Sequence, residues 1–301
     1  MDNPIQIESP DRFSDYQLID SGGFEKLEKY GNLLIARPEP QAIWNKSLSI
    51  GDWQTMHHAW FHKARTTGSS EPSENGTWSL KPGTPEQWTI HYKIDQVQLA
   101  FRLGFTAFKH IGVFPEQAGN WEYLYKQIKQ LPVSNPQVLN LFAYTGGASL
   151  AARAAGAEVS HVDSVKQVIS WARENMEASG LNNIRWVVED ALKYLQREAR
   201  REKKYHAIIL DPPAYGRGPN GEKWLLEKNL DETIWLCKQI LHTENSFLIL
   251  NLYSLGHSSL IAETLLKNHF PNYKHFEMGE FFVKDQASKK LPLGIFARIK
   301  F

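Results

Sequence analysis

A short apolar run in the middle of the chain leads into a turn that contains two adjacent glycines. The run spans residues 138–142, the turn reads AYTGG, and an alanine-rich segment with helical character, 148–155, follows. Glycine allows a ligand to approach the backbone closely. A helix that starts directly after such a turn points unpaired N–H groups and a partial positive charge at that ligand. The turn therefore predicts a binding site at the tip of a first strand.

Acidic side chains follow the next three apolar segments. They are Asp163, then Glu189 with Asp190, and then Asp211. In an open α/β sheet the ligand lies at the carboxyl ends of the strands, and a carboxylate at the end of the second strand can accept both ribose hydroxyls of an adenosine. The spacing favours a nucleoside-containing ligand.

The fourth segment ends in a different kind of polar loop, in which Asp211 is followed by Pro212 and Pro213. Two prolines stiffen the loop and remove two N–H donors. The carbonyl groups of the loop and the Asp211 carboxylate can hold an amino group or the edge of a flat ring, and Tyr215 can stack on such a ring. The loop predicts a site that presents a planar substrate to a reactive group on a cofactor.

These residues meet only if the strands that carry them form one sheet. Apolar segments alternate with helical patterns from residue 120 onwards, which predicts a doubly wound, Rossmann-like α/β fold with a mostly parallel sheet. A helix over 120–131, with Asn120 as its N-cap, precedes the first strand. The last two strands, 273–282 and 294–301, are joined too closely for a crossover helix and must be antiparallel.

The first part of the chain differs from the rest in composition and pattern. It holds five of the ten tryptophans and reads as short strands broken by turns. We expect a strand-rich N-terminal substrate-recognition region over 1–105, followed by the Rossmann-like domain over 106–301. The segment 63–87 is rich in turn-forming residues and is predicted to be a long loop. His58 and His62 are four residues apart and could share a helix face, but packing roles are favoured over a metal site.

Composition gives no strong indication of a partner. The chain has 301 residues, 34 basic and 33 acidic side chains, and a net charge of +1, so no global attraction to nucleic acid or acidic lipid is expected. A single cysteine excludes an intramolecular disulfide. No secretory signal and no apolar run near the roughly 20 residues of a membrane span are visible. We expect a cytoplasmic protein without membrane contact, and the sequence predicts no oligomeric state.

The motifs NLFAYTGG, HVD, EDA and DPPAYGRG, taken together, resemble those of class I S-adenosylmethionine-dependent methyltransferases. More closely, they are similar to the bacterial group that contains the ribosomal large-subunit RNA methyltransferases. The resemblance covers roughly residues 106–301, and DYQLIDSGGFEKLEKYG is similar to the lead-in of one branch of that group. No PUA-type RNA-binding module, which some relatives carry, is visible.

The resemblance implies S-adenosyl-L-methionine as the cofactor and RNA as the partner. Asp163 would bind the ribose hydroxyls, Asp190 would accept from the adenine amino group, and Asp211 would face the methyl group. The implied catalytic residues are Asp211, Pro212, Pro213 and Tyr215. The implied cofactor-binding residues are Phe114, Gln117, Asn140, Phe142, Ala143, Tyr144, Gly146, Gly147, Asp163, Ser164, Asp190, Ala191 and Asp211.

One departure from the family pattern bears on the mechanism. Relatives that methylate carbon five of cytosine use a cysteine after the fifth strand, because that carbon is a poor nucleophile until a thiolate adds to its neighbour. Here residues 251–254 read NLYS, and Cys237 lies on an apolar helical stripe that favours core packing. We therefore expect direct in-line transfer to a nitrogen or oxygen held about 3–3.5 Å from the methyl group. A target base in RNA must be unstacked to reach such a site, and Lys109, Arg217 and Lys223 could contact phosphate at its rim.

Three other functions fit parts of the pattern. The main alternative is a methyltransferase that acts on a protein or a small molecule. A nicotinamide dehydrogenase is disfavoured because the turn lacks GxGxxG, and no GxxxxGK[ST] loop for a triphosphate is present. A non-catalytic binding protein would keep the turn and the acidic strand ends but would have no need of Asp-Pro-Pro.

Overall fold

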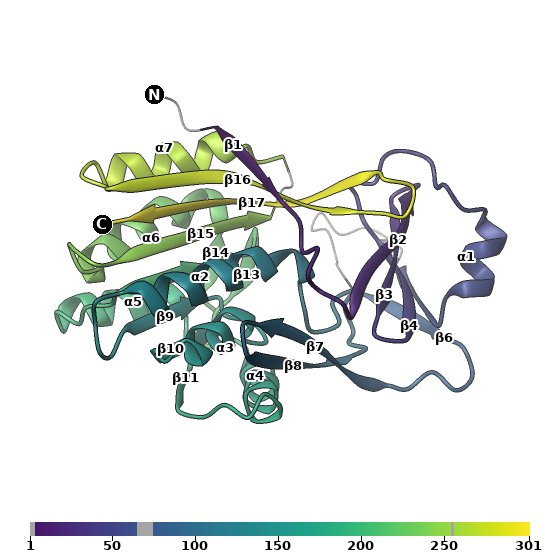
Figure 1. Cartoon of the computed structure of the whole chain (residues 1–301), viewed down its shortest axis with the longest axis horizontal. Coiled ribbons are helices and arrows are strands. Elements are labelled where there is room, and N and C mark those ends of the chain that lie inside the picture. Colours follow the sequence, from purple (N-terminus) through teal and green to yellow (C-terminus); the bar gives the residue numbers. More distant parts are fainter. Residues whose placement is uncertain (1–3, 65–74, 254–255) are drawn as a thin grey trace.

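The computed structural model describes residues 4–64, 75–253 and 256–301. Its larger part is an eight-stranded sheet covered by helices (Figure 1). Five neighbouring strands of this sheet are parallel, while β17 runs antiparallel to both of its neighbours. The strand order across the sheet is β1 (Ile5–Glu8), β16 (His275–Lys284), β17 (Lys290–Lys300), β15 (Phe247–Tyr253), β12 (Ala207–Leu210), β9 (Gln137–Leu141), β10 (Glu158–Asp163) and β11 (Ile184–Val188).

Helices cover both faces of the sheet because its central strands are apolar on both sides. Val138 belongs to one buried cluster and its neighbour Leu139 to the other, as alternation along a strand requires. One face packs against α2 (Ala118–Gln130), α3 (Gly147–Ala154) and α4 (Lys166–Ala178), and a short 3₁₀ turn, η1 (Pro115–Gln117), precedes α2. The other face packs against α5 (Ala191–Arg200), α6 (Leu226–Ile240) and α7 (Ser259–His269).

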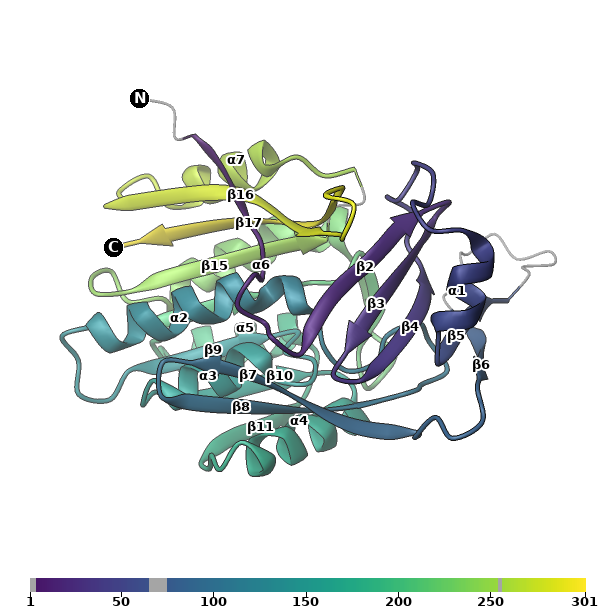
Figure 2. The ribbon, with the colours of Figure 1, turned by 45° about the vertical axis from the view of Figure 1, so that its right-hand side comes forward.

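A smaller, strand-rich part lies beside this sheet (Figures 1 and 2). Its five-stranded sheet consists of β2 (Tyr16–Gly22), β3 (Glu25–Tyr30), β4 (Leu33–Pro38), β5 (Ala59–Lys63) and β6 (Gly76–Leu80), with α1 (Ile50–Met56) next to them. The hairpin of β7 (Gln87–Ile94) and β8 (Val97–Gly104) packs against α4. A second short hairpin, β13 (Tyr215–Arg217) and β14 (Lys223–Leu225), follows β12.

The first residues of the chain join the two parts. Strand β1 pairs in parallel with β16 at the edge of the eight-stranded sheet, and the chain then passes across to β2 (Figure 2). Further contacts come from the β16–β17 turn, where the Lys289 ammonium contacts the buried Asp20 carboxylate at 3.0 Å. The division at residue 105 stays a prediction.

The predicted fold is confirmed, including the antiparallel pair at the end of the chain. The prediction that Asn120 caps α2 is wrong, because the N-cap residue is Gln117 and Asn120 lies inside the helix. Its buried side chain instead donates to the Gln117 side-chain oxygen at 3.0 Å and accepts from the Arg298 guanidinium at 3.0 Å. Arg298 comes from β17, 178 positions later, so local sequence did not reveal this contact.

The predicted loop over 63–87 is also wrong in part. Residues 65–74 lie outside the described residues, but Gly76–Leu80 forms strand β6 against β5. Trp78 explains the difference, because its ring packs against Phe61 and Phe105 with centroids about 5 Å apart. Aromatic packing outweighs the turn-forming composition here.

The two histidines do not share a helix face. His62 lies on β5 and stacks on Trp60, while the His58 ring nitrogen accepts from the Leu34 backbone. His58 therefore has a packing role, and His62 is an exposed side chain in contact with a ring. In the described ranges, no group of three or more His, Cys, Asp or Glu side chains could hold a metal ion. None of the helices in the same ranges is long and apolar enough to cross a bilayer.

Candidate active site

The candidate site lies where the order of the strands reverses, between β9 and β12. Leu141 pairs with Leu210, so Phe142 and Asp211 leave the sheet side by side. The chain then turns to opposite faces, into α3 after β9 and towards α6 after β12. A crevice forms at such a point because the two connections diverge. Its cavity is lined by Phe101, Val113, Phe114, Gln117, Asn120, Trp121, Leu124, Asn140, Phe142, Ala143, Tyr144, Thr145, Gly146, Gly147, Ala148, Ile209, Asp211 and Ile249.

The turn after β9 has an unusual backbone. Phe142, Tyr144 and Gly146 have φ angles of 55°, 48° and 95°. Positive φ is uncommon for residues other than glycine, and bulky side chains there are strained. The turn is held by neighbouring groups: the Tyr144 N–H donates to Asp163 at 2.9 Å, and the Thr145 hydroxyl donates to the Gly112 carbonyl at 2.6 Å. Strain that the surroundings maintain in this way is typical of functional sites.

The two glycines of the turn serve different purposes. Gly146 supplies the positive φ at the N-cap of α3. At Gly147 a Cβ atom would lie 2.5 Å from the Trp121 indole of α2. Gly147 therefore allows α2 and α3 to pack closely beside the cavity, a reason that the turn sequence alone did not reveal.

Asp163 links the turn to the next strand. Its carboxylate accepts from the backbone N–H groups of Tyr144 and Val165, each at 2.9 Å. Burial raises the pKa of Asp163, and these backbone hydrogen bonds oppose the shift. Two oxygens offer about four acceptor positions. The backbone donors, which include the Ser164 N–H, leave part of this capacity for donors on a ligand, such as a hydroxyl.

Asn140 is oriented by a buried polar chain behind the turn. Its amide nitrogen donates to the Ser149 hydroxyl at 2.9 Å, which contacts the His161 ring nitrogen at 3.0 Å. Burial lowers the pKa of His161 to about 3, so the ring is neutral. Asn140 also lines the cavity, and its side-chain oxygen is an acceptor suited to a cationic or N–H group.

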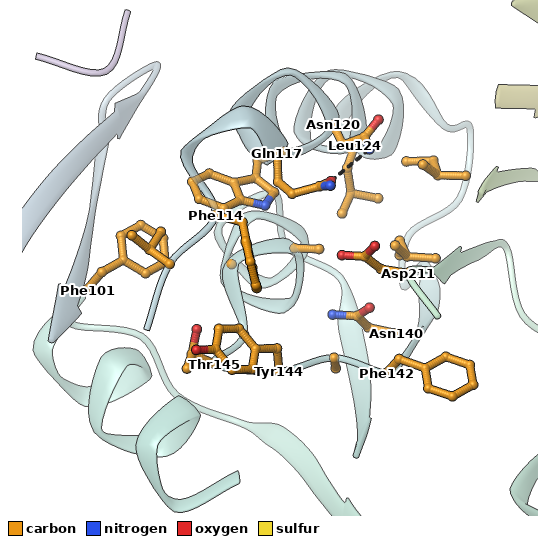
Figure 3. A pocket seen from close by; sticks show the side chains of 18 residues that line it. Phe101, Phe114, Gln117, Asn120, Leu124, Asn140, Phe142, Tyr144, Thr145 and Asp211 are labelled. Atoms are coloured by element: carbon orange, nitrogen blue, oxygen red, sulfur yellow. Dashed lines mark hydrogen bonds between the residues drawn. The ribbon is translucent and has the colours of Figure 1, made fainter. Parts of the chain in front are cut away.

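Asp211 faces the same cavity from β12 (Figure 3). Burial raises the pKa of its carboxyl to about 6, and the Asn251 amide, which donates at 2.6 Å, partly offsets the shift. The loop after it is fixed by Trp224, whose indole N–H donates to the Pro213 carbonyl at 2.7 Å. A fixed acceptor therefore lies at the carboxyl end of the fourth strand.

Phe114 and Gln117 border the cavity from η1 (Figure 3). The Phe114 ring lies 5.2 Å from the Tyr144 ring, between centroids. Gln117 is held by Asn120, and Asn120 by Arg298 of β17. Both residues therefore line the cavity, and their contact with a cofactor stays a prediction.

Not all predicted site residues line this cavity. Asp163 and Ser164 lie at the end of β10, and Asp190 follows the next strand along the same edge. Asp190 is the N-cap of α5 and accepts from the Lys193 N–H, and Ala191 is buried in the core. Three more predicted residues do not line the cavity and come shortly after Asp211 in the chain. Pro212 is buried, and Pro213 and Tyr215 are exposed.

Sequence reasoning gave two polar residues no role in the site, Asn120 and Asn251. Asn251 is the one with a usable signal, a single amide in the otherwise apolar strand FLILNLY. A buried amide needs partners, and in β15 that partner is the neighbouring Asp211.

Comparison with known proteins agrees with this geometry. The crystal structure of a S-adenosylmethionine-dependent methyltransferase from Agrobacterium tumefaciens is 36% identical in sequence, covers 99% of this chain and 96% of its own, and has a TM-score of 0.87. The chain belongs to the S-adenosylmethionine-dependent methyltransferases. A methyltransferase structure solved with S-adenosylhomocysteine, 19% identical over 96% of this chain and 76% of its own, shares the fold at a TM-score of 0.68.

Curated relatives of this methyltransferase match smaller parts of the chain. The family model described as conserved hypothetical protein 95 matches residues 115–245. The ribosomal RNA large subunit methyltransferase K/L of Shewanella frigidimarina is 29% identical over 44% of this chain and 18% of its own. The ribosomal RNA large subunit methyltransferase I of Aeromonas salmonicida is 38% identical over 27% of this chain and 22% of its own. The chain thus aligns with about a fifth of the length of each.

Proposed function

We propose that this methyltransferase methylates a nucleobase of RNA, with ribosomal RNA as the RNA class. The observation that carries the proposal is the Asp211 carboxylate, which faces the cavity at the strand switch and is followed by a proline pair. A carboxylate there can accept from an exocyclic amino group of a base. The names of the curated relatives support RNA as the substrate.

The residues along the strand ends fit S-adenosyl-L-methionine. Asp163 has acceptor capacity left for the ribose hydroxyls, with Ser164 and the exposed Val165 beside it. The turn from Asn140 to Gly147 would surround the methionine part. Further along the edge, Asp190 and Ala191 are assigned to the adenine side, and Phe114 and Gln117 would cover the cofactor.

The cofactor supplies a methyl group already activated on a sulfonium. The protein then has to bring a lone pair of the substrate to within about 3–3.5 Å, in line with the bond that breaks. In this account Asp211 accepts an N–H of the amine and so points its lone pair at the methyl group. Asn251 and Trp224 hold that acceptor and its loop in place. Tyr215 lies exposed at the rim, where it can stack on a base of the substrate.

A covalent mechanism finds no support in the position of the cysteine. Cys237 lies on α6 with 0% of its surface exposed, inside the apolar cluster on the face of the sheet that α5–α7 cover. Burial raises the pKa of its thiol, which suppresses the thiolate that nucleophilic attack needs. Packing is therefore confirmed as its role, and transfer is assigned to a nitrogen or oxygen.

The strand-rich N-terminal region is assigned to substrate recognition. The Tyr253 hydroxyl, at the end of β15, lies 3.4–3.5 Å from the Glu39 carboxylate. Glu39 is buried and also pairs with Lys26 of β3 at 3.3 Å. This part of the chain therefore borders the same edge of the sheet as Asp211.

Nucleoside analysis of labelled RNA tests the reaction type. Purified protein, tritiated S-adenosylmethionine and unmodified ribosomal RNA should give a nitrogen- or oxygen-methylated nucleoside after digestion. Cys237→Ser should give the same product at the same rate. A labelled 5-methylcytosine that disappears in Cys237→Ser would overturn the proposed mechanism.

A further inference from the structure

The short hairpin after the Asp-Pro-Pro loop is firmly attached to the site. Strands β13 and β14 are joined by residues 218–222, where the Gly218 N–H donates to the Glu222 carbonyl at 2.8 Å. Trp224 of β14 is buried, contacts the Phe142 ring and holds Pro213. Glu222 pairs with Lys193 of α5. The hairpin is therefore a fixed extension of the rim beside Asp211.

The outer face of this hairpin combines an aromatic ring with two cations. Tyr215 pairs with Leu225, and Arg217 lies directly opposite Lys223. Side chains two apart on a strand share a face, so these four residues lie together while Trp224 faces inward. Tyr215 is 52% exposed, and Arg217 and Lys223 are exposed as well.

The facing pair of cations has no charge partner within the part of the chain that is described. Among residues 4–64, 75–253 and 256–301, no ion pair involves Arg217 or Lys223, and the nearest carboxylate in sequence, Glu222, is engaged by Lys193. Like charges directly opposite each other destabilise a hairpin. An anion between the two side chains would relieve this repulsion.

We infer that this face, Tyr215 with Arg217 and Lys223, binds the single-stranded RNA that flanks the target base. A cationic surface that tracks phosphates next to an aromatic ring that stacks on a base is the usual combination for single-stranded nucleic acid. The bases of a duplex are stacked on each other and do not offer their faces to a tyrosine. The inference rests on the proposed function and adds that the RNA around the target base is single-stranded.

Fluorescence anisotropy with a labelled single-stranded oligoribonucleotide and with its duplex tests this inference. Each phosphate contact on a single strand contributes about 0.7 to the slope of log affinity against log salt. Arg217→Ala/Lys223→Ala should lower that slope by about 1.4. Arg200→Ala/Lys204→Ala removes the same charge from exposed residues at and beyond the end of α5 and should leave the slope unchanged. Tyr215→Ala should weaken binding about tenfold, whereas Tyr215→Phe should retain it.

The outcomes separate this inference from the proposed function. Equal salt slopes for the two double variants, in a protein that still methylates RNA, would overturn the hairpin assignment and leave the function standing. Preference for the duplex, or for an acidic peptide, would overturn it as well. If the wild-type protein neither binds nor methylates RNA, the function itself fails.

Discussion

Asp211 shows how two opposing effects set the state of one residue. Burial favours the neutral acid and raises its pKa, while the amide of Asn251 donates to the carboxylate and favours the charged form. Burial is the larger effect, and the pKa lies at about 6 instead of its ordinary 3.8. Near neutral pH the group is an ionised acceptor held in a site that penalises its charge, a state typical of functional carboxylates.

Asp211→Asn should therefore make the fold more stable while it lowers activity. When the pKa of a carboxyl group is raised in the native state, the fold becomes less stable as the pH rises through that pKa. The native state then carries a charge that its surroundings disfavour. A shift of about two pH units corresponds to about 3 kcal/mol. Denaturant unfolding of Asp211→Asn should show a gain of up to about 3 kcal/mol at neutral pH and no gain near pH 4.

The same variant should lose methyl transfer about 10²–10³-fold, the usual effect of removing one preorganised polar group. Its affinity for S-adenosylhomocysteine should change little. In the wild-type protein the rate should fall as pH drops through about 6, where Asp211 gains its proton. Full activity of Asp211→Asn would contradict the role assigned to the carboxylate.

Asp163→Ala tests the cofactor assignment. The variant loses the acceptor positions assigned to the ribose and also releases the backbone N–H of Tyr144. Titration calorimetry with S-adenosylhomocysteine should show an affinity lower by about tenfold or more, while circular dichroism shows an intact fold. Unchanged affinity would refute the ribose assignment.

At the scale of elements, the site depends on how closely α2 and α3 pack. Much of this could be predicted: the strand before the glycine turn and the helix after it lie within a residue of the predicted 138–142 and 148–155, because their apolar and alanine-rich patterns are strong. The role of Gly147 could not, because the indole that fills the space of its missing side chain comes from another helix, 26 positions earlier in the chain, at Trp121. The contacts of Asn120 with Arg298 and of Asn251 with Asp211 were missed for the same reason, since these partners are distant in sequence.

Gly147→Ala should destabilise the protein through this contact. The added methyl group would lie 2.5 Å from the Trp121 ring, so the helices must shift. Overpacking of this kind costs about 1–3 kcal/mol, measurable by denaturant unfolding. Gly51→Ala in α1 is a matched control, because its methyl group would meet only ordinary contacts and alanine is favoured in helices. A loss of stability no larger than that of the control would contradict the packing explanation.

At the scale of the whole molecule, the N-terminal segment holds the two parts together through buried charge. Arg298 is 3% exposed and binds both oxygens of Glu8 in β1, as well as Glu277 and Asn120. The same guanidinium therefore ties the first strand to the sheet and, through Asn120, orients Gln117 in the cavity.

Arg298→Ala should lower the free energy of unfolding by about 3–5 kcal/mol, because it leaves partly buried carboxylates unpaired. It should also weaken cofactor binding. Arg12→Ala removes another ion pair of this segment, with Glu122, in which the arginine is 79% exposed. That change should cost less than about 1 kcal/mol. Similar losses in both variants would show that the buried network is no stronger than a surface pair.

Transfer of a tritiated methyl group shows directly whether the protein methylates RNA and whether Asp211 is needed. Wild-type protein and Asp211→Asn would each be offered ribosomal RNA, assembled ribosomal subunits, and an RNA-free extract of proteins and metabolites. We predict label in RNA or subunits with the wild-type protein and almost none with Asp211→Asn, although both bind S-adenosylhomocysteine. Label confined to the extract would contradict RNA as the substrate, and equal labelling by the variant would contradict the site.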